Sequence, residues 1–209
     1  TWGAPTLSTI TAYMKILAFV DLHGSIETLK KMGETAKKEN ARYIICAGDH
    51  TIFGNSHKKI IDRLDEIGIP VLLIHGNHES ESETRRLCSA TKNVKFLHKK
   101  THTEGDYVFI GYGGGGFSKF DDEFELWTKK LELDKKKKII LITHQPPLNT
   151  KLDDIWGESA GNRSFRRFIE SKKPVLAISG HLHENSGRKD KIGETKLVNP
   201  GPKGMVLEI

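Results

Sequence analysis

Residues 174–185 read "PVLAISGHLHEN" and place two histidines directly behind an apolar run. The run "PVLAI" has the length and composition of a buried strand, so we expect the chain to leave the protein core near Gly180. His181 and His183 follow at once, separated by one residue. Two imidazoles directly after the carboxyl end of one strand suggest that both bind a common partner.

The same arrangement recurs after four other apolar runs. Where each strand is expected to end, the next residues are polar side chains that can bind a metal. These are Asp21 and His23 after 15–20, Asp49 after 42–47, Asn77 and His78 after 70–75, and His144 after 138–143. In an open α/β sheet the carboxyl ends of the strands lie along one edge, where ligands bind. Any one of these residues alone is more simply a helix cap or a structural histidine, but five coincidences at equivalent positions indicate one site.

Apolar strand-like runs alternate with amphipathic segments, which predicts a parallel core of βαβ units. Helices are expected over 25–40, with Ser25 as N-cap and Asn40 at its end, and over 56–68. After residue 90 the short pieces "VKFLHK" and "TEGDYVFIGYG" predict a partly antiparallel second half. The predicted strands are 15–20, 42–47, 70–75, 107–112, 138–143, 174–179, 195–199 and 204–209.

No repeat, low-complexity tract or linker divides the chain, so residues 14–209 are predicted to form one domain. Residues 1–13 carry no charge and match neither a helix nor a strand pattern. We interpret them as a leader foreign to the protein and Met14 as its native start. They also lack the basic start and long apolar centre of a signal peptide.

The composition is that of a soluble globular protein: 209 residues, 36% hydrophobic and 29% charged. No apolar run approaches the roughly 20 residues that cross a bilayer, so no membrane association is expected. Cys46 and Cys88 have no CxxC partner and are expected to be buried, which favours a cytoplasmic protein. The net charge of +6 and the lysine-rich stretch 130–143 make nucleic acid a weaker candidate partner.

Histidines outside the strand-end pattern are given structural or surface roles. His50, His57, His98 and His102 lie beside lysines, polar residues or turns and are expected to face solvent. His75 directly follows a predicted strand and could support the site from behind.

Imidazole and carboxylate ligands suit manganese, iron, zinc, cobalt or nickel. The set is too large for one tetrahedral site and fits two sites that share a carboxylate. Two metals about 3.5–4 Å apart form a clamp for in-line displacement at phosphorus.

These motifs resemble those of the calcineurin-like metallophosphoesterase superfamily. Its pattern is D-x-H, G-D, G-N-H-[DE], a lone His and G-H-x-H, in that order. The chain reads "DLHG" (21–24), "GDH" (48–50), "GNHE" (76–79), "TH" (143–144) and "GHLH" (180–183). The length and the stretches "THQPP" and "VNPG" look like small single-domain phosphoesterases, including the group related to brain metallophosphoesterases. The resemblance implies a four-layer α/β/β/α sandwich of two mixed sheets flanked by helices.

The resemblance also implies residue roles. Asp21, His23 and His183 would hold one divalent metal ion, and Asn77, His144 and His181 the other, with manganese expected to serve in vitro. Asp49 would bridge the two ions. His78 would be the catalytic residue that contacts the phosphate and stabilises or protonates the leaving group.

The expected activity is hydrolysis of small phosphomonoesters or phosphodiesters by in-line attack of a metal-bridging hydroxide. A non-catalytic metal-binding scaffold of the same fold is one alternative, and the intact ligand set weighs against it. A nuclease is the other, favoured by the positive charge and disfavoured by the absence of a second domain. The glycine-rich stretch "GYGGGGFSKF" (111–120) contains no P-loop pattern and is expected near the edge of the site, where it would shape substrate access.

Overall fold

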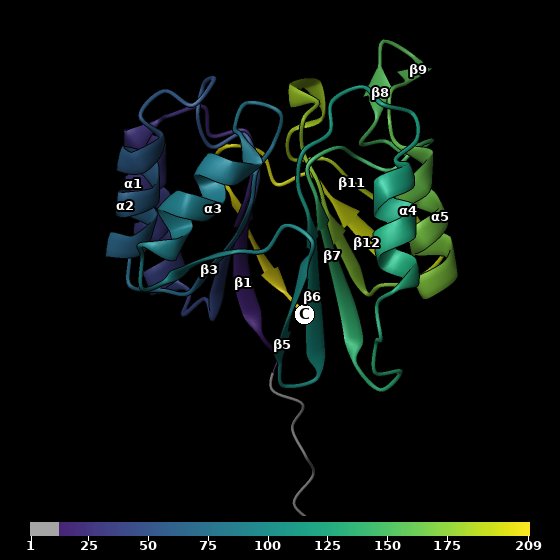
Figure 1. The fold of residues 1–209 in the computed structure, drawn as a ribbon, viewed down its shortest axis with the longest axis horizontal. Coiled ribbons are helices and arrows are strands. Elements are labelled where there is room, and N and C mark those ends of the chain that lie inside the picture. Colours follow the sequence, from purple (N-terminus) through teal and green to yellow (C-terminus); the bar gives the residue numbers. More distant parts are fainter. Residues whose placement is uncertain (1–12) are drawn as a thin grey trace, which may run out of the picture.

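Two β-sheets face each other in a computed structural model that describes residues 13–209 (Figure 1). The first sheet has the strand order β13-β1-β2-β3-β4, and the second has β11-β12-β10-β7-β6-β5. Helices α1, α2 and α3 cover the outer face of the first sheet, while α4 and α5 cover that of the second. The predicted four-layer sandwich of two mixed sheets is confirmed.

The elements of the first sheet and its helices are β1 (Lys15–Phe19), α1 (Ile26–Lys38), β2 (Tyr43–Ala47), α2 (His57–Glu66), β3 (Val71–Ile74), α3 (Glu81–Ser89), β4 (Val94–Phe96) and β13 (Met205–Glu208). Strands β1 to β4 are parallel, and β13 pairs antiparallel with β1. Ser25 caps α1 as predicted, since its side chain accepts a hydrogen bond from the Thr28 N–H at 3.4 Å.

The second sheet and its helices comprise β5 (Lys100–Glu104), β6 (Tyr107–Tyr112), α4 (Asp122–Lys129), β7 (Lys138–Thr143), α5 (Arg163–Lys172), β10 (Leu176–Ile178), β11 (Lys189–Ile192) and β12 (Thr195–Val198). A small hairpin of β8 (Asp154–Ile155) and β9 (Glu158–Ser159) and the 3₁₀ turn η1 (His183–Asn185) lie in the connections. Strands β6, β7, β10 and β12 are parallel, whereas β5 and β11 pair antiparallel at the two edges.

All eight predicted strands are present, and the sequence pattern was less informative about the remaining elements. Helices α4 and α5 were not predicted. The expectation of a partly antiparallel second half is confirmed by β5, β11 and β13, although β4 pairs parallel with β3. The interpretation of residues 1–13 as a leader falls, apart from Tyr13, outside the described residues.

Three layers of apolar side chains hold the sandwich together. The helices α1–α3 pack on the first sheet through residues such as Leu29, Ile60 and Leu87. The two sheets meet through Ile16, Phe109 and other apolar side chains of their facing strands. The third cluster joins the second sheet to α4 and α5. Because the sheets are fixed to each other, the loops at their carboxyl edges are fixed as well.

Candidate metal centre

Every residue that the sequence assigned to the site lies in a loop that directly follows a strand. Strands β1, β2 and β3 of the first sheet and β7 and β10 of the second end at the same edge of the sandwich (Figure 1). The site is therefore built across the seam between the two sheets. The residues that meet there are Asp21, His23, Asp49, Asn77, His78, His144, His181 and His183.

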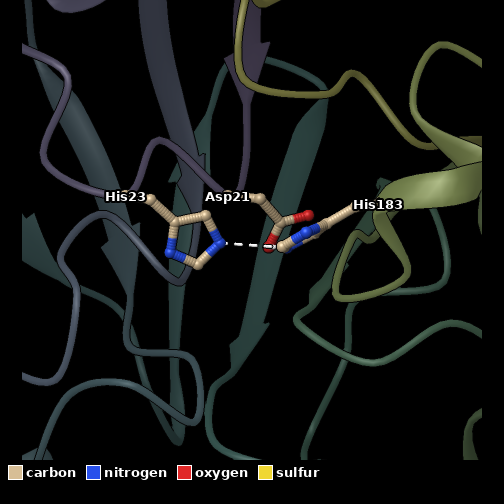
Figure 2. Close-up of side chains that lie close together, drawn as sticks. All are labelled: Asp21, His23 and His183. Atoms are coloured by element: carbon tan, nitrogen blue, oxygen red, sulfur yellow. Dashed lines mark hydrogen bonds and ion pairs between the residues drawn. The ribbon is translucent and has the colours of Figure 1, made fainter.

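The first cluster consists of Asp21, His23 and His183, whose side chains point toward one another (Figure 2). Nε2 of His23 lies 2.9 Å from Nε2 of His183, which is 4.0 Å from Oδ1 of Asp21. Nδ1 of His23 donates to the carbonyl oxygen of Thr51 at 3.2 Å. This hydrogen bond leaves the lone pair of Nε2 facing the cluster, the usual way in which a backbone carbonyl orients a metal-binding imidazole.

The second cluster consists of Asp49, His144 and His181, with Asn77 beside them. Nε2 of His144 lies 3.2 Å from Oδ2 of Asp49 and 3.0 Å from Oδ1 of Asn77. Nδ1 of His144 donates to the carbonyl oxygen of Ala47 at 2.9 Å, so Nε2 again faces inward.

Asp49 connects the two clusters. Its carboxylate lies within 4.8 Å of the ligand atoms of His144 and His181, and also within 4.8 Å of those of His23 and His78. The backbone N–H of His78 donates to Oδ1 of Asp49 at 3.0 Å, which fixes the carboxylate between the clusters. A single carboxylate thus faces both groups of imidazoles.

A pair of divalent cations fits these donors. Nε2 of His181 is buried and has no hydrogen-bond partner, although buried ring nitrogens normally find one. Burial also lowers the pKa of His181 to about 4, so the ring is neutral and can act as a ligand near neutral pH. The donors are imidazole nitrogens and carboxylate oxygens, the combination that borderline divalent metals prefer.

Asp21 and Asp49 titrate in different ranges. Burial raises the pKa of Asp21 to about 6, and His144 and His183 offset only part of that rise. Burial also disfavours ionised Asp49, but its hydrogen bond with His144 outweighs burial and holds the pKa of Asp49 well below its usual range. The same contact overcomes the effect of burial on His144 and raises the pKa of His144. Asp49 and His144 thus stabilise each other's charged form.

The His78 ring is oriented by the loop after β2. Its Nδ1 accepts a hydrogen bond from the backbone N–H of Phe53 at 3.4 Å, and its Nε2 lies 3.8 Å from Oδ2 of Asp49. Since Nδ1 accepts, the ring proton is on Nε2, which faces the centre. His78 is thus oriented to donate a hydrogen bond to a group bound beside Asp49.

Four of the clustered residues hold a backbone conformation that is rare outside glycine. Their φ angles lie in the left-handed region, at 55° for Asp21, 46° for His23, 48° for Asp49 and 70° for His181. Such strain is typical of functional loops that the surrounding structure fixes in place. Gly48, with φ 97°, permits a close approach of the loops, because a Cβ there would lie 2.7 Å from both Gly76 N and His144 Nδ1.

Glu79 is a functional residue to which the sequence analysis assigned no role. Its buried carboxylate accepts hydrogen bonds from the backbone N–H groups of Asp49 (3.1 Å), Thr51 (2.8 Å) and Gly76 (2.9 Å), and from the Thr51 hydroxyl (2.8 Å). Burial disfavours the ionised carboxyl, but His50 and these donors together hold the pKa of Glu79 below its usual value. Glu79 therefore ties the loop that carries Asp49 to the loop that carries Asn77. The only signal for it was the fourth position of "GNHE".

The expectation that His50, His57 and His98 face solvent is wrong, because all three are buried. Nε2 of His50 lies 2.9 Å from Nε2 of His57, and Nδ1 of His98 accepts from the Gly113 N–H at 2.8 Å. His102 is half-buried. Polar sequence neighbours do not determine whether a side chain is buried, because burial depends on contacts with segments distant in the chain, and the pattern therefore misled. His75 is buried and its ring contacts that of His98 at 4.6 Å, so it supports the loops and does not face the two clusters.

The glycine-rich stretch 111–120 lies beside the site, as predicted. The loop follows β6, and the ring of Phe117 contacts the His181 ring with centroids 4.7 Å apart.

Within residues 13–209, no helix is long and apolar enough to cross a membrane.

Comparison with known proteins gives a family match over most of the chain. The model of the family described as calcineurin-like phosphoesterase matches residues 14–185. The uncharacterized protein MJ1162 of Methanocaldococcus jannaschii is 32% identical over 204 residues, covering 91% of this chain and 89% of that protein.

Solved structures share the fold. The structure of TT1561 from Thermus thermophilus matches with a TM-score of 0.75 at 19% identity, covering 91% of this chain and 90% of the other. A dimetal phosphatase from Danio rerio matches with a TM-score of 0.56 at 10% identity, covering 88% and 86%.

Proposed function

Because the chain belongs to the calcineurin-like phosphoesterase family, we propose that it is a phosphoesterase that hydrolyses small phosphomonoesters or phosphodiesters with two divalent metal ions. The observation that carries the proposal is the position of Asp49 between two clusters of imidazoles. A non-catalytic scaffold would not need both clusters to be complete.

In this proposal Asp21, His23 and His183 hold one ion, and Asn77, His144 and His181 hold the other, with Asp49 shared. When bound, the two ions supply an activated water and offset negative charge on the phosphoryl oxygens. We propose manganese as the metal that supports activity in vitro.

The protein's own contribution is to orient the reacting groups. Glu79 and the left-handed loop residues hold the donors before any ligand binds, so little reorganisation accompanies the reaction. His78, with its proton on Nε2, donates a hydrogen bond to the phosphoryl group and stabilises the negative charge that develops on the departing oxygen. The backbone N–H of Phe53 keeps the ring in that orientation.

The proposal extends to organisation and location. Residues 14–209 act as one domain, since each half of the chain supplies donors to both clusters. A cytoplasmic location is supported by Cys46 and Cys88, which are buried free thiols. Within the family, the likeness to the brain metallophosphoesterase group is part of the same proposal.

The test combines metal analysis with a substrate screen. Purified protein should carry about two equivalents of metal and hydrolyse p-nitrophenyl phosphate or bis-p-nitrophenyl phosphate when manganese is present. Asp49→Ala should lose both ions and all activity. His78→Ala should keep its metal while turnover falls at least about 100-fold, the usual cost of losing one hydrogen-bond donor to a developing negative charge.

His102→Ala, which removes a histidine distant from the clusters, is the control and should retain both metal and turnover. Loss of metal in the His78 variant would contradict the role given to His78. Absence of hydrolysis in metal-loaded wild-type protein, across substrates and pH, would favour the scaffold.

A further inference from the structure

Exposed aromatic side chains are concentrated at the edge that carries the metal centre. Among residues 13–209, eight large hydrophobic side chains are exposed, and five of them lie in three loops at this edge: Ile52, Phe53, Phe117, Phe120 and Trp156. Single exposed apolar residues are ordinary, but an exposed cluster beside a polar centre is typical of a ligand site.

Phe53 is held directly against the proposed catalytic histidine. Its ring is stacked on that of His78, with centroids 4.3 Å apart and an interplanar angle of 13°. The side chain is nevertheless 77% exposed, so the face that turns away from His78 is open to solvent. Phe53 also has a left-handed backbone, with φ 48°, and its N–H donates to the same ring. The turn therefore presents an open aromatic face at a fixed position.

A second aromatic wall lies near His181. Phe117 is 66% exposed and contacts His181, and Trp156, at the β8–β9 turn, is 92% exposed. Phe117 and Trp156 line a cavity of about 520 Å³ together with Lys119 and Ile155. Aromatic side chains of the loops after β2 and β6 thus contact His78 and His181, and the cavity extends from Phe117 to Trp156.

We propose that the substrate of this centre is a phosphate ester whose leaving group carries a planar aromatic ring, carbocyclic or heterocyclic, and that Phe53 is the residue that selects it by stacking. This inference rests on the proposed function, since it places the leaving group beside His78. An open, flat ring face favours stacking with another ring over contact with a flexible chain, because offset stacking adds to the burial of area.

Benzyl phosphate and butyl phosphate provide the test, because their leaving alcohols have similar basicity and only one has a ring. We expect wild-type kcat/KM to be about tenfold higher for benzyl phosphate, the upper range for one aromatic pair. Phe53→Leu should bring the two values within about twofold, because only benzyl phosphate loses a stacking partner. Leu126→Ala, an exposed position on α4, is the control and should keep the wild-type ratio.

Binding supplies a readout independent of turnover. Calorimetry of the metal-loaded protein with benzylphosphonate and butylphosphonate should give dissociation constants about tenfold apart, and Phe53→Leu should remove the difference. If neither ester is hydrolysed but the binding preference persists, the proposed function fails and the stacking role stands. If both esters are hydrolysed and bound equally, the stacking role is overturned and the function stands.

A lipid surface is the competing explanation for exposed aromatic residues. Sedimentation with anionic phospholipid vesicles distinguishes it. If Phe53→Leu reduces vesicle binding and leaves the benzyl-to-butyl ratios of kcat/KM and of the dissociation constants unchanged, the ring contacts lipid and the proposal is overturned. No vesicle binding by the wild-type protein, together with the expected ratios, supports it.

Discussion

Replacing Glu79 with glutamine tests whether one buried carboxylate organises the centre. Glutamine has the same shape, but one carboxylate oxygen becomes an NH₂ group. The amide oxygen can keep the hydrogen bonds from the N–H groups of Asp49 and Gly76 only if the NH₂ faces Thr51. The Thr51 hydroxyl can rotate to accept a hydrogen bond, but the Thr51 N–H cannot, so one buried donor is left without a partner.

The expected cost follows from these contacts. A buried N–H without a partner costs about 1–3 kcal/mol, and each of the two retained backbone bonds weakens by about 1 kcal/mol when its acceptor loses its charge. The free energy of unfolding of the metal-free Glu79→Gln protein should therefore fall by about 3–5 kcal/mol. Small domains have only about 5–15 kcal/mol in total, so this loss is large.

Urea unfolding followed by circular dichroism measures this loss after treatment with a chelator. Metal content should fall as well, because the loops that carry Asp49 and Asn77 lose their common acceptor. Glu34→Gln, at an exposed position on α1, is the control and should change the unfolding free energy by less than about 0.5 kcal/mol. A loss below about 1 kcal/mol for Glu79→Gln would refute the hydrogen-bond account.

Two further predictions concern the ions. Metal affinity should fall below about pH 6, because burial raises the pKa of Asp21 to about 6 and a proton then competes for the carboxylate; the calorimetric dissociation constant of the first cluster should rise about tenfold per pH unit below that point. A constant value between pH 7 and pH 5 would contradict this competition. His183→Ala should remove one of two ions, because only the cluster of Asp21 and His23 loses a donor; elemental analysis that finds equal depletion of both sites would argue against the division.

Strand positions and strand-end residues could be predicted from the sequence because both depend on local pattern. Each apolar run is long enough to form one strand of a sheet, and each motif begins at the residue where the apolar run ends. Parallel strands then bring the motifs to one edge regardless of their separation in the chain. His23 and His183 are 160 positions apart and still meet at 2.9 Å.

Features that depend on contacts between distant segments could not be predicted from the local sequence pattern. His50 and His98 have polar sequence neighbours, yet each is enclosed by side chains from other elements. The central role of Glu79 depends on the loops after β2 and β3 approaching one carboxylate, which no spacing rule describes. The pairing of β13 with β1 joins the last strand to the first, so local periodicity carries no information about it.

The position of the candidate centre across the seam between the sheets has a consequence for biosynthesis. The residues after β1, β2 and β3 leave the ribosome early, whereas His183 comes 160 residues after His23, and closing such a long loop is slow. A chain released before residue 181 would still contain five of the seven candidate ligands but would lack one donor from each cluster. Tight metal capture would then occur only in completed molecules, so unfinished chains would not withdraw ions from the cell's pool.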